Sequence, residues 1–352
     1  MKKMLMTTAL VGSLVSGISA ANAATSVSGN LAISYWATAN DAAAGTGSKS
    51  YNGFGTESQI NLSGSGDLNN GIKYAAGFSW ELDGGEYLGS GLGASIEASG
   101  KAATEGTYIE FINGGTTLGV GADRVANLDG TRSNYVGFGY ARISGIHSSI
   151  AQTSYNDAYN QFGFYGKQNV GVGTVAVVYT PNHGAGNLAA DDIGVSTAKT
   201  TIDAGTSAFT LGFQGDLGVK GLGVKIGYSS AEKSNVADKD TTGQVISLDY
   251  QMGATKVGVT RGKVESSAGI ENTSTELGIA QSVSSTTSVG LAYTKADTNR
   301  AGYPESEKIW TASVGYNMGP VALTMQYKKA TDMNGTSGQD ASQLGMYLAT
   351  KF

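Results

Sequence analysis

The sequence predicts an all-β fold, a transmembrane antiparallel β-barrel of 16–18 strands. Three observations lead to this prediction: side chains alternate in character along many short segments, turns rich in Gly, Asn and Asp join those segments in pairs, and aromatic residues recur at two levels of the segments. A period of two indicates a strand whose two faces meet different surroundings. Cys is absent, so pairing between strands, and not disulfides, must stabilise the fold.

The first 23 residues predict a secretory signal peptide. A basic start at Lys2 and Lys3 precedes an apolar stretch, and Ala21 and Ala23 form a small-x-small cleavage site. We therefore expect residues 24–352 to form the mature barrel domain. Removal of the two lysines changes the formal net charge from −5 to −7. A chain this acidic is not expected to bind nucleic acid.

The mature chain is predicted to be a ladder of hairpins. Eight hairpins and one strand at each end give a count of 18 strands. The paired segments are residues 60–62 and 72–82, 109–111 and 118–120, 136–140 and 146–150, 162–164 and 175–179, 209–213 and 224–228, 246–250 and 257–259, 277–279 and 289–293, and 310–316 and 321–327. The long connections fall on one side of this ladder, an asymmetry typical of short periplasmic turns and long extracellular loops. They are residues 37–53, 83–105, 181–207, 229–242, 295–308 and 329–342.

Two aromatic belts favour a membrane barrel over a soluble β-sandwich. The belt next to the long connections comprises Tyr35, Trp80, Tyr179, Tyr228, Tyr293 and Tyr327. The belt next to the short turns comprises Tyr140, Tyr250, Tyr316 and Phe352. No mature segment approaches 18 continuous apolar residues, so we expect no transmembrane helix.

The last ten residues predict the strand that closes the barrel. Leu344, Met346, Leu348 and Phe352 share one face, although Thr350 stands where a larger apolar residue is more usual. We expect this strand to pair with the first strand, near residues 27–35, because an open sheet would expose two edges to lipid. The segment resembles the C-terminal strands that the barrel-assembly machinery of Gram-negative bacteria recognises.

Together these features resemble a Gram-negative outer-membrane porin of the general diffusion type. The resemblance covers the mature chain and implies an integral outer-membrane homotrimer in contact with lipid, lipopolysaccharide and the barrel-assembly machinery. The chain departs from it in two ways. General porins have 16 strands, and their third external loop is long, whereas the connection here, flanked by Arg124 and Arg132, is short. Either one hairpin is misassigned, or connection 83–105 or 181–207 narrows the pore.

If the apolar positions face lipid, the alternate positions face a lumen. A charge on the lipid face would cost a few kcal/mol at mid-depth, which supports this choice of faces. The charged candidates for the pore lining are Glu57, Lys73, Glu81, Glu110, Asp123, Lys167, Lys225, Asp249, Lys256, Glu276 and Lys328. Such a mixed lining suits many small polar solutes. With the acidic net charge, it predicts a weak cation preference.

The residues favour a passive, water-filled diffusion channel, not an enzyme, with no nucleotide or metal cofactor. Two histidines and no cysteine exclude the usual His/Cys zinc site. His147 and Ser149 resemble part of an outer-membrane phospholipase site, but their phase places them away from lipid. Two alternatives remain: a substrate-specific channel for sugars or phosphate, and a non-conducting barrel that acts as an adhesin or structural anchor.

Overall fold

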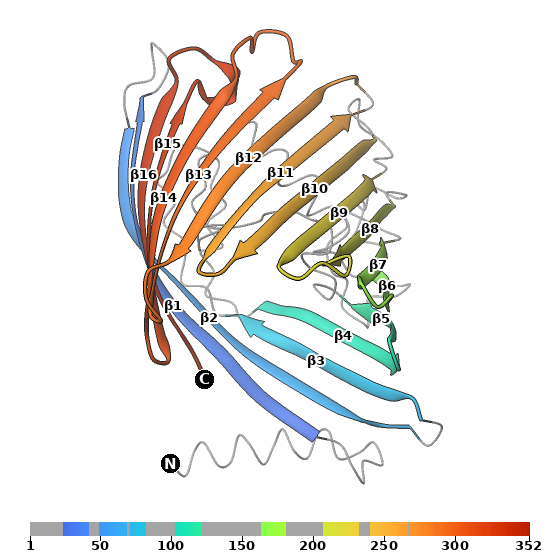
Figure 1. The fold of residues 1–352 in the computed structure, drawn as a ribbon. Coiled ribbons are helices and arrows are strands. Elements are labelled where there is room, and N and C mark those ends of the chain that lie inside the picture. Colours follow the sequence, from blue (N-terminus) through green and yellow to red (C-terminus); the bar gives the residue numbers. More distant parts are fainter. Residues whose placement is uncertain are drawn as a thin grey trace, which may run out of the picture.

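The computed structural model describes residues 24–41, 49–68, 71–81, 103–121, 163–180, 207–231, 240–266 and 268–352. Over these ranges the chain forms a barrel of long tilted strands (Figure 1). The first eight strands are β1 Ala24–Asp41, β2 Lys49–Asp67, β3 Lys73–Glu81, β4 Ala103–Asn113, β5 Thr116–Gly121, β6 Gly163–Asn169, β7 Gly173–Thr180 and β8 Ala208–Gly215. The others are β9 Leu222–Ala231, β10 Thr241–Met252, β11 Thr255–Ser266, β12 Glu271–Ser282, β13 Thr287–Thr298, β14 Glu307–Met318, β15 Val321–Thr331 and β16 Asp340–Lys351.

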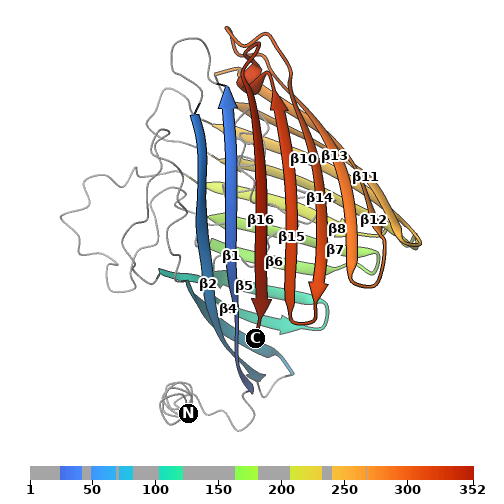
Figure 2. The ribbon, with the colours of Figure 1, turned by 90° about the vertical axis from the view of Figure 1, so that its left-hand side faces the viewer.

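The sheet is a closed antiparallel barrel. Each strand pairs with its neighbours in the sequence, and β1 pairs with β16, so the described wall has no open edge. Figure 2 shows β1 and β16 side by side, with the C-terminus at the end of the barrel that carries the short turns. Closure satisfies the backbone N–H and C=O groups of the wall by pairing between strands, as a lipid environment requires.

The described wall contains 16 strands, which lies within the predicted range of 16–18, but the count of 18 is too high by one hairpin. The hairpin expected at residues 136–150 lies outside the described residues, within the connection from β5 to β6. Gly121 of β5 pairs directly with Gly163 of β6, which leaves no place in the wall between them. The third long connection is therefore residues 122–162, longer than any other in the chain, and the expectation of a short third connection is also wrong.

The wall has two different faces, defined here as the outer face and the inner face. The outer face carries the exposed apolar side chains, for example Ile246 and Leu248 on β10 and Leu277 and Ile279 on β12. Tyr250 and Tyr316 lie on it near the short turns, and Trp80, Tyr179, Tyr228 and Tyr327 lie on it near the long connections. These positions match members of the two predicted belts, whereas Tyr140 lies outside the described residues. The described residues include no helix that is long and apolar enough to cross a membrane.

Sequence reasoning missed two members of the belt next to the long connections. Phe54 and Trp310 are 70% and 59% exposed on the outer face. The ring of Phe54 lies 5.0 Å from that of Tyr35, and the ring of Trp310 lies 4.6 Å from that of Tyr293, measured between centroids. The two residues of each pair stand directly opposite each other on neighbouring strands. This juxtaposition follows from the register of the two strands and cannot be read from either segment alone.

Short turns join the strands at the end next to the C-terminus. Gly253 and Gly319, in the turns before β11 and β15, adopt φ of 60° and 72°, a conformation that glycine tolerates best. In the last of these turns, the Pro320 carbonyl accepts a hydrogen bond of 3.1 Å from the Thr350 hydroxyl. This contact accounts for the hydroxyl side chain at a position where a larger apolar residue was expected.

The junction of β1 and β16 is fixed by the last residue. Phe352 and Gly29 exchange backbone hydrogen bonds of 2.8 and 3.0 Å. A Cβ added to Gly29 would lie 2.5 Å from Cζ of Phe352, so the aromatic ring covers this glycine on the outer face. The Phe352 ring therefore forms the outer surface at this point of the junction.

A second glycine on the same junction accommodates an inner-face aromatic residue. A Cβ on Gly345 would lie 2.0 Å from Cζ3 of Trp36, so the indole ring lies directly on the Gly345 backbone. We expect Gly345→Ala to displace this ring and to lower the free energy of unfolding by about 1–3 kcal/mol. Urea titration of the folded barrel, followed by tryptophan fluorescence, measures the change. Gly166→Ala on β6 is the control, because a Cβ there would lie in ordinary contact at 3.4 Å from Leu118 Cδ2. Equal losses in both variants would contradict the proposed clash.

Candidate functional site

The inner face of the barrel is the candidate site, because charged side chains gather there. Strand register places the described charged candidates on the face opposite the exposed apolar residues. These residues are Lys73, Glu110, Lys167, Lys225, Asp249, Lys256, Glu276 and Lys328. Glu57 and Glu81 stand on β2 and β3, but their side chains lie outside the described part of the structure. Asp123, Arg124 and Arg132 lie outside the described residues, as does the signal cleavage site at Ala21 and Ala23.

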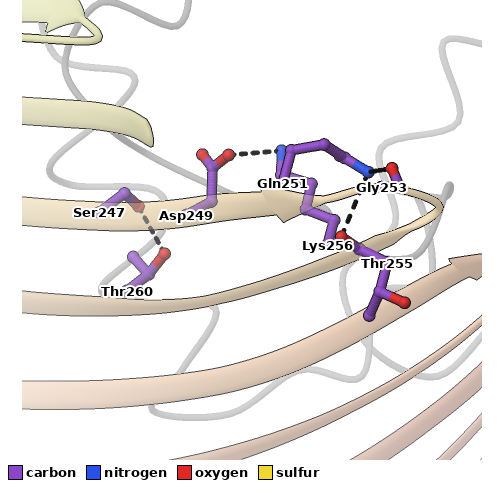
Figure 3. Close-up of polar contacts among 7 residues, drawn as sticks. All are labelled: Ser247, Asp249, Gln251, Gly253, Thr255, Lys256 and Thr260. Atoms are coloured by element: carbon purple, nitrogen blue, oxygen red, sulfur yellow. Dashed lines mark hydrogen bonds and ion pairs between the residues drawn. The ribbon is translucent and has the colours of Figure 1, made fainter. Parts of the chain in front are cut away.

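An ion pair joins neighbouring strands near the short turns (Figure 3). Lys256 Nζ on β11 lies 3.0 Å from Asp249 Oδ2 on β10. Gly223 of β9 stands opposite Asp249, and a Cβ there would lie 2.5 Å from the carboxylate Oδ1. The glycine therefore lets the carboxylate lie against the β9 backbone. This packing holds Asp249 close to the wall, beside Lys256.

Polar contacts continue along the same two strands. Ser247 and Thr260 face each other across β10 and β11 and share a hydrogen bond between their hydroxyl groups (Figure 3). Gln251 Nε2 donates to the carbonyl oxygens of Gly253 and Thr255, at 2.7 and 3.2 Å. The Gln251 side chain thereby braces the turn that joins the strands. The ion pair thus stands in a continuous polar stripe on the inner face.

A second charged cluster lies on β4, β5 and β6, the strands on either side of the longest connection. Glu110 of β4 and Tyr165 of β6 are only 5% and 4% exposed. Tyr165 Oη donates to Glu110 Oε2 at 2.8 Å, and Lys167 Nζ lies 3.8 Å from the same oxygen. The Tyr165 ring reaches Glu110 across Gly119 of β5, where a Cβ would lie 2.4 Å from the ring. The missing side chain at Gly119 thus allows a charge-assisted contact between strands that are not adjacent.

Towards the long connections, the inner face holds more widely spaced polar groups. Thr294 Oγ1 donates to Glu276 Oε2 at 3.2 Å. Lys328 stands opposite Gln343, whose Nε2 donates to Thr38 Oγ1 at 3.0 Å. Glu307, at the end of β14, is fully buried and accepts a hydrogen bond of 2.9 Å from the Asn334 backbone N–H. Glu307 therefore fixes the connection from β15 to β16.

Sequence reasoning did not identify Trp36, Tyr165 or Glu307 as inner-face residues. Trp36 directly follows Tyr35 of the outer belt, so its phase alone would have placed it on the inner face. Tyr165 likewise follows the outward Phe164. Glu307 was assigned to a loop because the predicted connection extended one residue past the start of β14. The alternation signal was present for both aromatic residues, but large apolar rings were expected to face lipid.

The buried contact at Glu110 gives a testable stability prediction. We expect Glu110→Ala to lower the free energy of unfolding by about 2–3 kcal/mol, because it leaves Tyr165 Oη without its acceptor and removes a partner of Lys167. Glu110→Gln keeps an acceptor oxygen and is expected to lose less. Urea titration of the parent protein and the two variants measures their free energies of unfolding. A Glu110→Gln variant as unstable as Glu110→Ala would contradict the role of the hydrogen bond.

A closed barrel with an exposed apolar outer face and a charged, hydrogen-bonded inner face defines a transmembrane β-barrel with a polar interior. The sequence profile of the Gram-negative porins matches residues 7–335, and the chain belongs to this family. It is therefore an integral protein of the Gram-negative outer membrane, and its family and fold are those of a diffusion channel rather than of an enzyme. Among curated protein sequences, none matches the chain.

Solved porin structures share the fold at low sequence identity. The anion-selective porin from Comamonas acidovorans has a TM-score of 0.69 and 15% identity, over 94% of this chain and 100% of that one. In-vitro folded OmpT, an outer membrane protein of Vibrio cholerae, has a TM-score of 0.65 and 11% identity, over 94% and 98%. Salmonella typhi OmpF, in complex with daunomycin, has a TM-score of 0.61 and 10% identity, over 93% and 97%. At these identities the likeness establishes the fold alone.

Proposed function

We propose that the chain forms a passive, water-filled pore for ions and small hydrophilic solutes, lined by the charged residues of the inner face. One observation carries this proposal: the faces of the closed wall differ, with exposed apolar side chains outside and paired charges inside. A soluble or lipid-filled barrel would not need charged groups on its interior. No catalytic step and no cofactor enter this function.

The near balance of charges on the described inner face supports weak selectivity. Its lysines are Lys73, Lys167, Lys225, Lys256, Lys328 and Lys351, and its acids are Asp67, Glu110, Asp249, Glu276 and Glu307. Opposite charges close together offset each other's field, so no single ion class is strongly excluded. The weak cation preference expected from the net charge stays a prediction. Reversal potentials in asymmetric KCl test it, and a preference for chloride would contradict it.

Conductance of the mature protein in planar lipid bilayers tests the pore directly. We expect stepwise, ohmic single-channel currents. A barrel that is folded, as shown by circular dichroism and heat-modifiable migration, but gives no current steps would favour the non-conducting anchor. Block of the current by low concentrations of one sugar, with no effect of others, would favour a substrate-specific channel.

We also propose that the chain assembles as a homotrimer and contacts lipid, lipopolysaccharide and the barrel-assembly machinery. A trimer form is described for OmpT of Vibrio cholerae, which shares the fold, and supports a homotrimer here. The exposed apolar outer face and its aromatic belts suit contact with lipid and lipopolysaccharide. The C-terminal strand, with Leu344, Met346, Leu348 and Phe352 on its outer face, suits recognition by the barrel-assembly machinery. Residues 1–23 are proposed to be removed as a signal peptide.

A further inference from the structure

Four cationic side chains, called here the basic cluster, lie on the outer face beside the aromatic belt that is next to the long connections. Lys295 on β13 and Lys308 on β14 stand directly opposite each other, and Arg261 on β11 lies in the same row of the sheet. Lys329 on β15 stands opposite Trp310 of the belt, one pair nearer the middle of the barrel. From β11 to β15, these two rows of the outer face contain no acidic residue.

The two lysines that stand opposite each other have acid partners only on the side away from the belt. Lys295 Nζ lies 3.5 Å from Asp297 Oδ2, two residues farther along β13. Lys308 Nζ lies 3.6 Å from Asp332 Oδ2, just beyond the end of β15. Like charges directly opposite each other destabilise a sheet, so an anion between these lysines would be favourable.

The other two cations of the cluster have no acid partner in the described part of the chain. Within it, Arg261 and Lys329 form no ion pair with an acidic side chain. Two more acids of this rim, Glu265 and Glu271, instead contact Lys263, at 3.2 and 2.8 Å. The level of the rim that lies nearest the belt is therefore cationic, and the acids lie beyond it.

A hollow in the outer face lies on the same strands, nearer the middle of the barrel. It encloses about 590 Å³, and most of its lining is apolar. Ala312 leaves this space because it is smaller than its cross-strand neighbours Leu291 and Tyr327. Ala312 and Lys308 are four residues apart on β14, about 13 Å along a strand. Half the hydrocarbon thickness of a bilayer is about 15 Å, so the hollow lies at the depth of acyl chains when the cluster lies at the headgroups.

We propose that one lipopolysaccharide molecule binds here, with a lipid A phosphate on the basic cluster and an acyl chain in the hollow. The inference deepens the proposed contact with lipopolysaccharide, on which it rests, by assigning the contact to β11–β15. The long connections mark the extracellular end of a porin barrel, so the cluster faces the outer leaflet. Lys and Arg donate charge-assisted hydrogen bonds to phosphate oxygens. Cations beside an apolar hollow select a phosphorylated lipid over both a neutral lipid and a free anion.

The affinity for lipid A tests the cationic part of the site. Mature barrel folded in zwitterionic micelles is titrated with dansyl-labelled, bis-phosphorylated lipid A, and energy transfer from the tryptophans of the protein reports binding. EDTA is present, so divalent cations cannot bridge the phosphates to the acids of the rim. Lys308→Gln/Lys329→Gln should raise the dissociation constant by about fivefold or more. Lys220→Gln/Lys351→Gln makes the same change in net charge next to the short turns and should leave it unchanged.

Two further comparisons separate the headgroup from the acyl chain. Lipid A without phosphates should bind the parent more weakly, and it should bind the Lys308→Gln/Lys329→Gln variant as well as it binds the parent. Ala312→Leu fills the hollow with an apolar group and should raise the dissociation constants of both lipids. Ala76→Leu makes the same change on the outer face of β3, between Gly64 and Ile109, and should raise neither.

The outcomes distinguish this site from the wider proposals. Equal affinities of the parent for the two lipids, or equal effects of the two double variants, would overturn the site. If the parent did not bind lipid A at all, the proposed contact with lipopolysaccharide would fail with it. A changed oligomeric state in Ala312→Leu, with lipid A affinity unaltered, would overturn the inference in favour of contact between copies of the chain. Single-channel conductance in bilayers without lipid A measures the pore function independently of all these results.

Discussion

Leu291→Lys is expected to lower the free energy of unfolding of the barrel by about 2–4 kcal/mol, the loss typical of a lysine at the lipid face near mid-depth. Leu291 is 57% exposed on the outer face of β13, with Ile279 and Ala312 as its cross-strand neighbours. The ammonium group would lose its hydration in hydrocarbon without gaining a partner. Urea titration of the protein folded into lipid vesicles measures the loss.

The adjacent residue supplies a matched control. Ala292 faces the interior, between Gly278 and Thr311, so Ala292→Lys places the same charge in an aqueous lumen one position along the chain. We expect this variant to keep most of the stability of the parent. A loss in Ala292→Lys as large as that in Leu291→Lys would show that the assignment of faces is wrong, and with it the basis for a polar pore.

Deletion of Phe352 is expected to prevent most of the protein from inserting into the outer membrane. The deletion removes both backbone hydrogen bonds to Gly29 and the ring that covers this glycine, and so opens the seam where the barrel closes. Export and the proposed processing after Ala23 should be unchanged, because both would act on the other end of the chain. The heat-modifiable folded fraction in isolated outer membranes is the measurement.

A second substitution tests the seam without shortening the chain. Gly29→Val keeps Phe352 but places a side chain where the ring lies, so we expect a partial loss of the folded fraction. Lys351→Gln, which changes the neighbouring inward residue, serves as the control. Normal insertion of the Phe352 deletion would show that neither the terminal ring nor its pairing with Gly29 directs closure.

The strands of the fold could be predicted because barrel walls carry a local signal. Alternation places Ile246, Leu248 and Tyr250 on one side of β10 and Ser247 and Asp249 on the other, and register confirms both sets. The same phase predicted which described charges share the inner face. Hairpin turns such as 253–254 and 319–320 fix the register of adjacent strands, so neighbours in sequence become neighbours in the wall.

Contacts between distant segments could not be predicted in this way. Periodicity at residues 136–150 resembles that of a wall strand, and only the pairing of Gly121 with Gly163 excludes it from the sheet. Likewise, Tyr165 reaches Glu110 because Gly119, on the strand between them, lacks a side chain. The sequence identifies each of these residues, but it does not show the space that a glycine leaves between distant segments of the chain. Site details that depend on such space, including the packing of Asp249 against Gly223, required the structure.

The pairing of β1 with β16 has a kinetic consequence. Gln343 donates to Thr38 across 305 positions of sequence, so the seam closes one of the longest loops that the chain can form. The entropy lost in such closure is regained only when the two ends meet, which makes the step slow. Until then both terminal strands present unpaired backbone groups and can associate with other chains. The time between export and closure is therefore when aggregation is the main hazard, and a periplasmic chaperone that shields these strands should raise the yield of folded barrel.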